Sequence, residues 1–255
     1  MIFRDAKTAM KICSSLFVTL LGLLSGAACA VTADELVAKN ISARGGMGKI
    51  KAIQSVRYTG KLELSGDFTA EFVLVRLITR LNQVRSDATL QGLTMVRAWD
   101  GQEGWGISPL FGRKDPERLS PDESKELIEI ADIDGPLVDS ASKGYRVEYL
   151  GTEDVDGTEA HKLKLTAKDG DVQYIYLDPD YFLVIRVLYQ RSVRGAEVEV
   201  ETDLGNYEKV DGVYFPFSID AGPKGGARTR KITIERMDAN LPLKDEIFRF
   251  PGGGK

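Results

Sequence analysis

The sequence has 255 residues, with 34 basic and 38 acidic side chains and a formal net charge of −4. Nucleic acid is disfavoured as a partner, because affinity for it comes mostly from clustered Lys and Arg that meet phosphate. The length suits one β domain with a core of its own, and no linker of domain-separating length divides the chain.

The N-terminal segment has the features of a secretory signal. Three basic residues come before the apolar stretch Ile12–Leu24, which is followed by the small residues Ala28-Cys29-Ala30. The apolar stretch is shorter than the roughly 20 residues that a transmembrane helix needs. We therefore expect export, with residues 1–30 as a signal peptide and residues 31–255 as a single domain.

The residues before the expected cleavage site leave one alternative open. Gly26-Ala27-Ala28-Cys29 partly resembles a bacterial lipobox, although Gly stands where Leu is usual. Either the mature protein is released in soluble form after Ala30, or it is anchored by a lipid at Cys29. Release after Ala30 would remove both cysteines of the chain, Cys13 and Cys29, so that no disulfide or cysteine metal site would remain.

The first half of the remaining chain predicts a helix followed by a meander of strands. Thr32 and Glu35 have capping-box spacing, which predicts a helix from Ala33 to Arg44 that Gly45-Gly46 ends. Strand-like runs then extend from Val56 to Ile107, with breaks at Ser65-Gly66-Asp67, Asn82, Gln91-Gly92 and near Asp100-Gly101. The run Phe72–Ile78 is apolar on both parities, so we expect both of its faces to be covered.

A helical insertion interrupts the strands. Ser120-Pro121-Asp122-Glu123 combines a Ser cap, Pro at the first helical position and Glu at the third. The helix that begins there should end at Gly135-Pro136, and a second short helix is expected over Leu137–Ser142. Because strands flank the insertion, it must rest on the sheet or on one of its open ends.

Antiparallel hairpins follow the insertion. The expected strands are Tyr145–Gly151, His161–Ala167, Val172–Leu177, Phe182–Tyr189, Ala196–Leu204, Tyr207–Phe217 and Ala227–Met237. Asp178-Pro179-Asp180 and Asp211-Gly212 are turn signals, and Pro216 is best tolerated at a sheet edge. If Arg194-Gly195 forms a two-residue turn, Arg186 lies opposite Asp203.

The side chains that could take part in catalysis or bind a metal give little support for an enzyme. His161, the only histidine, sits in mid-strand, where a structural or solvated role is expected. The acid pairs Asp154/Asp156 and Asp169/Asp171 each flank a glycine, as turn residues do. The paired indoles of Trp99 and Trp105 have two interpretations: walls of a lipid pocket, or core anchors of a hairpin. We therefore predict no catalytic, metal or cofactor residue, and no enzyme.

Several of these motifs together resemble the LolA/LolB-like outer-membrane lipoprotein-sorting superfamily. The similarity spans most of the sequence after residue 30. It consists of the export signal, the helix running into Gly46-x-Gly48-Lys49, Trp99-Asp100-Gly101 with Gly104-Trp105, the capped insertion, Tyr176-Leu177-Asp178-Pro179 with Arg186 downstream, and Tyr207-x-x-Val210-Asp211-Gly212-Val213-x-Phe215-Pro216.

The resemblance implies a fold and a function. The implied fold is mainly β: a curved, unclosed antiparallel β half-barrel, with an N-terminal helix and the insertion as a helical lid over the apolar concave face. The implied function is a periplasmic carrier that shields acyl chains of a lipid or lipoprotein during transfer between envelope membranes. Such a carrier would act as a monomer without cofactor, with an inner-membrane transporter and an outer-membrane receptor as partners.

Candidate lining residues follow from apolarity alone, because the resemblance assigns no cargo-contacting residue. The segment Ser120–Ser142 is interpreted as the lid. The candidates are Phe72, Leu74, Trp99, Trp105, Leu127, Ile130, Tyr174, Tyr176 and Phe182. Two alternatives remain: a periplasmic sensor or assembly factor that binds lipids or a membrane partner without transport, and an enzyme acting on lipid or glycan esters, which would need a nucleophile and base that the motifs do not show.

Overall fold

The computed structural model describes residues 31–66, 68–193 and 196–252. The expected signal peptide, Cys29 and the expected turn Arg194-Gly195 lie outside these described residues. The helices are α1 (Ala33–Ala43), α2 (Met47–Ala52) and α3 (Pro121–Ala131), with the short 3-10 turns η1 (Pro109–Phe111) and η2 (Asp245–Ile247). The strands are β1 (Ser55–Leu64), β2 (Ala70–Thr79), β3 (Gln83–Leu90), β4 (Leu93–Trp99), β5 (Gly104–Ser108), β6 (Arg113–Arg118), β7 (Arg146–Val155), β8 (Thr158–Thr166), β9 (Val172–Leu177), β10 (Val184–Val193), β11 (Ala196–Val210), β12 (Val213–Pro223) and β13 (Arg230–Ala239).

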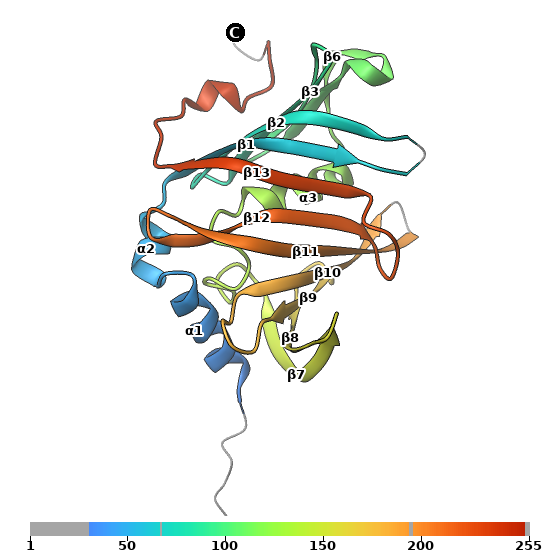
Figure 1. Cartoon of the computed structure of the whole chain (residues 1–255). Helices are drawn as coiled ribbons and strands as arrows, with labels where there is room; N and C mark the ends of the chain where they lie inside the picture. Colours follow the sequence, from blue (N-terminus) through green and yellow to red (C-terminus); the bar gives the residue numbers. More distant parts are fainter. Residues whose placement is uncertain (1–30, 67, 194–195, 253–255) are drawn as a thin grey trace, which may run out of the picture. The chain divides into compact units, whose positions relative to one another are not determined.

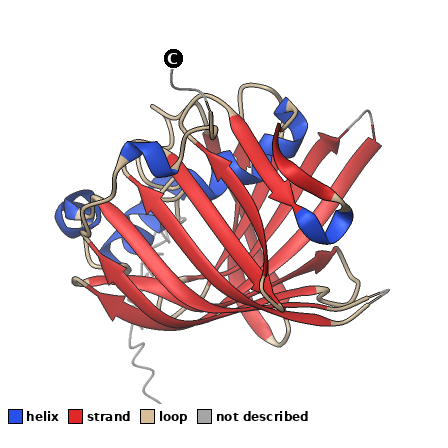
Figure 2. Cartoon of the chain, turned by 90° about the horizontal axis from the view of Figure 1, so that it is seen from above, coloured by secondary structure: helices blue, strands red, loops and turns tan. Residues whose placement is uncertain are grey.

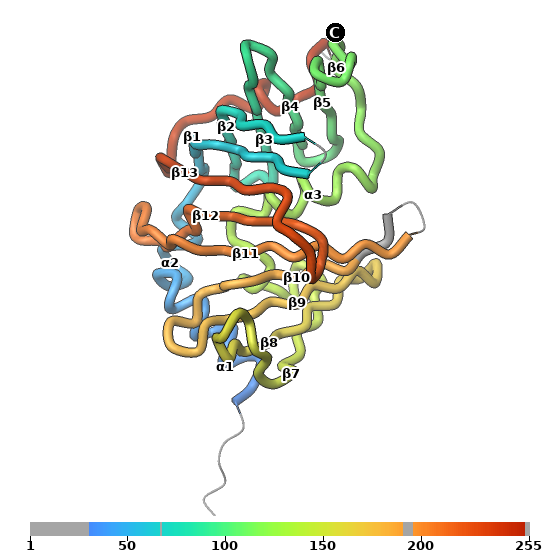
Figure 3. Tube along the Cα trace, turned by 45° about the vertical axis from the view of Figure 1, so that its right-hand side comes forward, coloured from blue at the N-terminus to red at the C-terminus, as the bar shows by residue number. Residues whose placement is uncertain are grey.

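The strands of the unit that begins at Val31 form one open antiparallel sheet. Their order is β6-β5-β4-β3-β2-β1-β13-β12-β11-β10-β9-β8-β7, and the described edge strands β6 and β7 do not pair with each other. Neighbours in the sheet are neighbours in sequence, apart from the β1–β13 pair at its middle (Figures 1 and 3). The sheet curves, and the helices lie across its concave side (Figure 2). The expected curved, unclosed half-barrel is confirmed.

This strand order determines where the helical insertion must lie. The chain leaves the sheet at one edge, β6, and re-enters it at the other edge, β7, so residues 119–145 connect the two edges. Such a connection has to run across a face of the sheet. Helix α3 contacts β2, β3, β4 and β5, and Leu127 and Ala131 are buried against the core of that half. The insertion therefore covers the concave face.

The two long helices begin as the sequence predicts. Thr32 and Ser120 each cap a helix with a full capping box, through Glu35 and Glu123 respectively. Helix α3 can approach β5 closely because Gly104 has no side chain, since a Cβ there would lie 2.4 Å from the Ser124 hydroxyl oxygen. Sequence capping signals thus place both helical segments correctly.

The expected helix over Leu137–Ser142 is wrong. This segment forms successive hydrogen-bonded turns, including those from the Lys143 N–H to the Asp139 carbonyl and from the Gly144 N–H to the Ala141 carbonyl. Asp139 has φ of +53°, a left-handed conformation that interrupts a right-handed helix. The apolar residues there, Leu137 and Val138, are nevertheless buried.

Helix α1 ends before Gly45-Gly46, as the sequence predicts. Gly45 has φ of +126°, and a Cβ at this position would lie 2.3 Å from the Gly212 carbonyl oxygen. The chain turns here into α2, and the Arg44 carbonyl accepts a 2.8 Å hydrogen bond from the Tyr214 N–H of β12. The end of α1 is therefore tied to the sheet at the β11–β12 turn.

Two expectations about strands need correction. Val73 is 63% exposed, so β2 is covered on one face only at that point, as antiparallel sheets allow. Strand β12 lies inside the sheet and not at its edge, but it pairs with β13 only over Ser218–Ala221. Pro216 lies in the other half of β12, where no hydrogen bond from its nitrogen to β13 is needed.

The register of the β10–β11 hairpin is as predicted. Arg186 lies opposite Asp203, and its Nε is 2.5 Å from the Asp203 carboxylate. Asp203 also binds Arg228 at 2.6 Å. The Arg186–Asp203 ion pair joins the two strands of this hairpin and favours the observed alignment.

Candidate functional site

A cavity of about 290 Å³ lies between the concave face of the sheet, the C-terminal end of α1 and the segment that begins with α3. Its lining is mainly apolar, and its volume is close to the lower end of the range for ligand pockets, about 300 Å³. It is lined by Asn40, Arg44, Val56, Tyr58, Arg76, Ile78, Glu129, Ile130, Asp132, Ile133, Gly135, Pro136, Leu137, Ile175, Val184, Val187, Tyr189, Leu204, Tyr207, Tyr214, Phe215, Pro216, Ile219, Ile234 and Met237.

Strand geometry explains how these side chains reach the cavity. Val56 and Tyr58 are two residues apart in β1 and face the same side of the sheet. In β13, Ile234 and Met237 are three residues apart, yet both line the cavity. The β1–β13 register shifts between Thr59 and Gly60, and this irregularity changes the alternation of β13. The shift therefore adds Met237 to the lining.

The cavity reaches the part of the sheet where β12 and β13 separate. Its lining includes Phe215 and Pro216 from the unpaired half of β12 and Met237 from β13. A second pocket, of about 600 Å³, is lined by residues from α1 and from the β9–β10 connection. Tyr207 and Tyr214 line both pockets, so the two spaces are neighbours separated by aromatic side chains.

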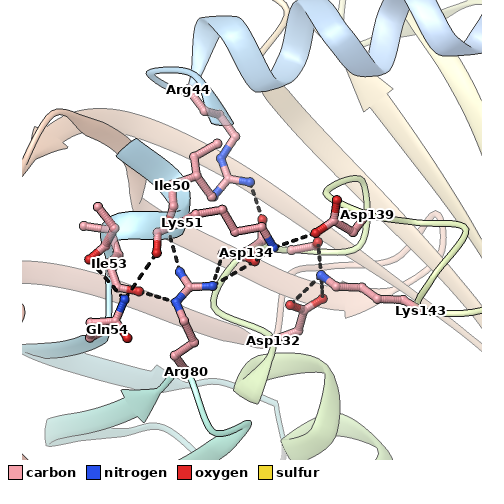
Figure 4. Close-up of polar contacts among 12 residues, drawn as sticks. Arg44, Ile50, Lys51, Ile53, Gln54, Arg80, Asp132, Asp134, Asp139 and Lys143 are labelled. Atoms are coloured by element: carbon pink, nitrogen blue, oxygen red, sulfur yellow. Dashed lines mark hydrogen bonds and ion pairs between the residues drawn. The ribbon is translucent and has the colours of Figure 1, made fainter. Parts of the chain in front are cut away.

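A polar cluster around Asp134 holds the segment after α3 in place (Figure 4). Asp134 is only 4% exposed, and its carboxylate binds Lys51 of α2 at 2.6 Å and Arg80, just after β2, at 2.9 Å. Arg80 also donates to the carbonyls of Ile53 at 2.6 Å and Ile50 at 2.7 Å. Burial opposes ionisation of Asp134, but hydrogen bonds from Lys51 and Arg80 outweigh it and lower the pKa. We call this cluster the Asp134 clasp.

A second polar contact fixes α3 itself to the sheet. Glu126 binds Arg97 of β4 at 3.0 Å and also binds Arg230 of β13. Arg97 additionally donates to the Glu123 carbonyl at 2.8 Å. The α3 helix is therefore held by polar contacts on two strands that are four places apart in the sheet.

The polar groups at the α1 end of the cavity differ from these clusters. Arg44 donates to the Asp134 carbonyl at 2.5 Å, and burial lowers its pKa. Asn40, one helical turn earlier, is 1% exposed and donates to the Phe182 carbonyl at 2.7 Å. The Tyr207 hydroxyl donates to the Val184 carbonyl at 2.7 Å, and burial raises its pKa.

The nine predicted lining residues are not gathered in one place. Ile130 lines the cavity and Phe182 lines the second pocket. Phe72, Leu74 and Leu127 are buried in the core beneath α3, with Trp99 packed against it. Tyr174 and Tyr176 belong to a cluster with Val155, Ala160 and Leu188, on the opposite face of β9 from the cavity residue Ile175.

The two indoles face opposite sides of their hairpin. Ala98 pairs with Trp105, so Trp99 faces the other side of the sheet. Trp105 is 1% exposed, donates to the Phe248 carbonyl at 2.7 Å and meets the Phe250 ring edge-on. It anchors the C-terminal segment and lines neither of the two pockets described above.

The other chemically notable residues occupy structural positions. His161 stacks on Phe182 with ring centroids 6.0 Å apart, and its Nδ1 is 3.1 Å from the Tyr149 hydroxyl. Burial lowers its pKa. Asp154 and Asp169 accept hydrogen bonds from the backbone of their own turns. Nowhere in the described part of the chain do three His, Cys, Asp or Glu side chains gather as a metal site would require.

None of the helices among the described residues is long and apolar enough to cross a membrane.

Comparison with known proteins is informative at the level of structure. No family model and no curated protein matches the sequence. A LolA superfamily protein from Nitrosomonas europaea superposes with a TM-score of 0.58 at 17% identity, over 86% of this chain and 98% of the other. The described unit has a LolA-like fold.

Two further structures support this conclusion. A DUF1329 family protein from Desulfovibrio piger gives a TM-score of 0.57 at 15% identity, over 85% of this chain and 97% of the other. A domain assigned to outer membrane lipoprotein sorting, from Vibrio parahaemolyticus, gives 0.55 at 13% identity, over 83% and 97%. At these identities the LolA-like similarity establishes the fold, and the function has to be argued from the cavity.

Proposed function

We propose that this LolA-like protein is a periplasmic carrier that binds acyl chains of a lipid or lipoprotein in the cavity and transfers them between envelope membranes. The observation that carries the proposal is the apolar cavity of about 290 Å³ under the insertion. A concave apolar space of this size, bounded by a few polar side chains, is the usual form of a binding site for an apolar ligand.

The chemistry of the lining favours a flexible apolar ligand. The cavity is surrounded mainly by aliphatic side chains from seven strands, including Val56, Ile78, Val187 and Ile234. Each methylene that leaves water contributes about 0.8 kcal/mol, so partial burial of an acyl chain already gives useful affinity. Release then requires only a partner that binds the chain better, without nucleotide hydrolysis by the carrier.

The insertion supplies the movable wall. Asp132, Ile133 and residues 135–137 line the cavity, and the Asp134 clasp holds this segment by polar contacts with α2 and the end of β2. Arg44, which follows α1, adds a hydrogen bond to the Asp134 carbonyl. Polar contacts of this kind can be exchanged for contacts with water when the segment moves. We therefore assign residues 132–137 as the part of the lid that opens for cargo.

Substitution within the cavity tests the proposal. Ile219 lines the cavity from β12 and is partly buried, so Ile219→Glu places a carboxylate in the apolar space. We expect the variant to lose co-purifying lipid and to stop transferring fluorescent phospholipid from donor to acceptor vesicles. Val73→Glu is the matched control, because Val73 is also a β-branched strand residue but points into solvent.

Three results would decide between the interpretations. Unchanged lipid content and transfer in Ile219→Glu, with circular dichroism like that of the wild type, would contradict the cavity as the site. If Val73→Glu also stopped lipid transfer, the outer face of the sheet would be part of the lipid-binding site. Lipid retention by the wild type without any transfer, together with tight binding to a membrane protein, would indicate a sensor in place of a carrier.

A further inference from the structure

Arg44 is a cavity residue whose charge is not matched by a carboxylate. It directly follows α1 as the C-terminal capping residue, and its guanidinium carries five N–H donors. Among the residues that the structure describes, its guanidinium makes one hydrogen bond, to the backbone carbonyl of Asp134 at 2.5 Å, and no ion pair. Burial lowers the pKa of Arg44, and the charges of Asp134 and Asp132 offset this only in part.

The carboxylates nearest to Arg44 are engaged by other cations. The Asp134 carboxylate binds Lys51 and Arg80. The Asp132 carboxylate binds Lys143 through both oxygens, at 2.6 and 2.7 Å. A partly buried cation without a carboxylate of its own costs folding free energy, and an anionic group bound beside it would offset part of that cost.

A second polar atom at the same end of the cavity is also unsatisfied. Asn40 lies four residues before Arg44 and so on the same face of α1. Its amide nitrogen donates to the Phe182 carbonyl, whereas its Oδ1 is buried and accepts no hydrogen bond from any described residue. The α1 end of the cavity therefore holds a cation that suits an acidic head group, and beside it an acceptor that needs an O–H or N–H group, such as a hydroxyl of the ligand.

The other arginine of the cavity is differently placed. Arg76 donates to the Ser86 hydroxyl at 2.6 Å and lies 5.4 Å from the centroid of the Tyr58 ring. The two arginines each have carboxylates nearby that are paired with other cations: Glu126 for Arg76, and Asp134 and Asp132 for Arg44. Arg44 differs in that its guanidinium meets neither a side-chain hydroxyl nor an aromatic ring among the described residues, but only a backbone carbonyl.

We propose that the preferred ligand is an acidic amphiphile, with an acyl chain in the cavity and a carboxylate or phosphate head group bound by Arg44 beside Asn40. This inference rests on the proposed function, since it assumes that an acyl chain fills the apolar space. It adds a charge requirement that the apolar lining alone does not impose. Neutral lipids of the same chain length should bind more weakly.

Three ligands with the same chain test this charge requirement. Dodecanoate, dodecyl phosphate and the neutral glycerol monoester of dodecanoic acid are titrated into delipidated protein by calorimetry at neutral pH and fixed salt. We expect both acids to bind the wild type at least about tenfold more tightly than the ester. A tenfold difference in affinity corresponds to about 1.4 kcal/mol. Arg44→Met also removes the hydrogen bond to the Asp134 carbonyl, so it should weaken the binding of all three ligands somewhat. It should weaken the binding of both acids much more, so that their preference over the ester is lost.

Two variants separate head-group binding from a structural role of Arg44. Arg44→Lys keeps the charge, so it should retain a preference for the acids. Arg57→Met is the matched control, because Arg57 is exposed on β1 and lines neither the cavity nor the second pocket. If Arg44→Met weakened the binding of the ester as much as the binding of the acids, Arg44 would only support the structure of the cavity, and the proposal would be wrong.

The remaining outcomes distinguish the two proposals. Equal affinity of the wild type for all three ligands would overturn the acidic head group and leave the carrier function intact. Binding of none of them would overturn both. Acetate and inorganic phosphate, which lack a chain, should not compete with dodecanoate or dodecyl phosphate; competition by either ion would show a site for free anions and would overturn the assignment to an amphiphile.

Discussion

The substitution Glu126→Gln tests how firmly α3 is held on the concave face. Glu126 binds Arg97 at 3.0 Å and also binds Arg230. Burial of Glu126 opposes its ionisation, but the charges of Arg230 and Arg97 and the hydrogen bond from Arg230 more than offset this, and they lower its pKa from 4.5 to about 2. The carboxylate is therefore more stable in the folded protein than in the unfolded chain.

The size and sign of the effect follow from linkage. A pKa lowered from 4.5 to about 2 corresponds to about 3 kcal/mol of folding free energy, at 1.36 kcal/mol for each pH unit. Because the folded-state pKa is the lower one, this contribution is complete above pH 4.5. It is lost as the pH falls towards about 2 and Glu126 takes up a proton in the folded state.

Urea unfolding at a series of pH values measures this contribution. At neutral pH we expect Glu126→Gln to lower the free energy of unfolding by up to about 3 kcal/mol. The difference between wild type and variant should shrink as the pH falls from 4.5 towards about 2, because the wild type then loses the same charge.

A surface pair provides the control. Glu117 and Arg113 are 3.6 Å apart, and both side chains are more than half exposed. Glu117→Gln should cost less than about 1 kcal/mol, as exposed ion pairs do. If Glu126→Gln also cost less than this, or if its difference from the wild type did not change with pH, the argument that Glu126 fixes α3 through its charge would be refuted.

Two further substitutions address the lid and the C-terminal segment. Asp134→Asn leaves Lys51 and Arg80 without their shared carboxylate. We expect the free energy of unfolding in urea to fall by about 3 kcal/mol, and hydrogen exchange in residues 132–137 to become faster. Unchanged exchange in these residues would contradict the role of the clasp. Trp105→Phe removes the hydrogen bond to the Phe248 carbonyl, so we expect a loss of about 1–3 kcal/mol with lipid binding unchanged. Loss of lipid in Trp105→Phe without loss of stability would restore Trp105 as a candidate cargo contact.

Local signals in the sequence predicted the elements well. The capping boxes at Thr32 and Ser120 gave the starts of both long helices, since capping depends on residues three positions apart. The Asp178-Pro179-Asp180 turn and the pairing of Arg186 with Asp203 were also predictable, because hairpin register follows from the strand pattern. Each of these features depends on neighbours in sequence or on adjacent strands.

The cavity lining was much harder to predict, because strand β9 is apolar or aromatic on both parities. By residue type alone, Tyr174 and Tyr176 are as good candidates for lining a pocket as Ile175. Of these three residues, only Ile175 faces the cavity. Alternation groups residues by face but does not say which face is concave. The sequence did not predict Met237 as a lining residue for another reason: the register shift in the β1–β13 pair changes which residues of β13 face the cavity.

The polar residues of the site carry no local signal. Arg44 and Asp134 are 90 positions apart, and Arg80 and Asp134 are 54 positions apart. Their contacts exist because the insertion crosses the sheet from edge to edge and returns to the helices at the other end of the chain. The sequence predicts the sequential hairpins, but it does not reveal the β1–β13 pairing, and this pairing makes β6 and β7 the two edges that the insertion has to connect.

If an acyl chain fills the cavity as proposed, the cavity volume sets an upper bound on its affinity. A group the size of a water molecule takes about 30 Å³, so 290 Å³ accommodates about ten methylene-sized groups. At about 0.8 kcal/mol each, these contribute about 8 kcal/mol, which corresponds to a dissociation constant near 1 µM before the costs of ordering the chain are counted. A second acyl chain would have to extend past Tyr207 and Tyr214 into the second pocket, or displace the wall that includes Ile133 and Leu137. In the proposed carrier, a chain that takes the second route breaks the Asp134 clasp on entry, and closing of the clasp would favour release of the cargo.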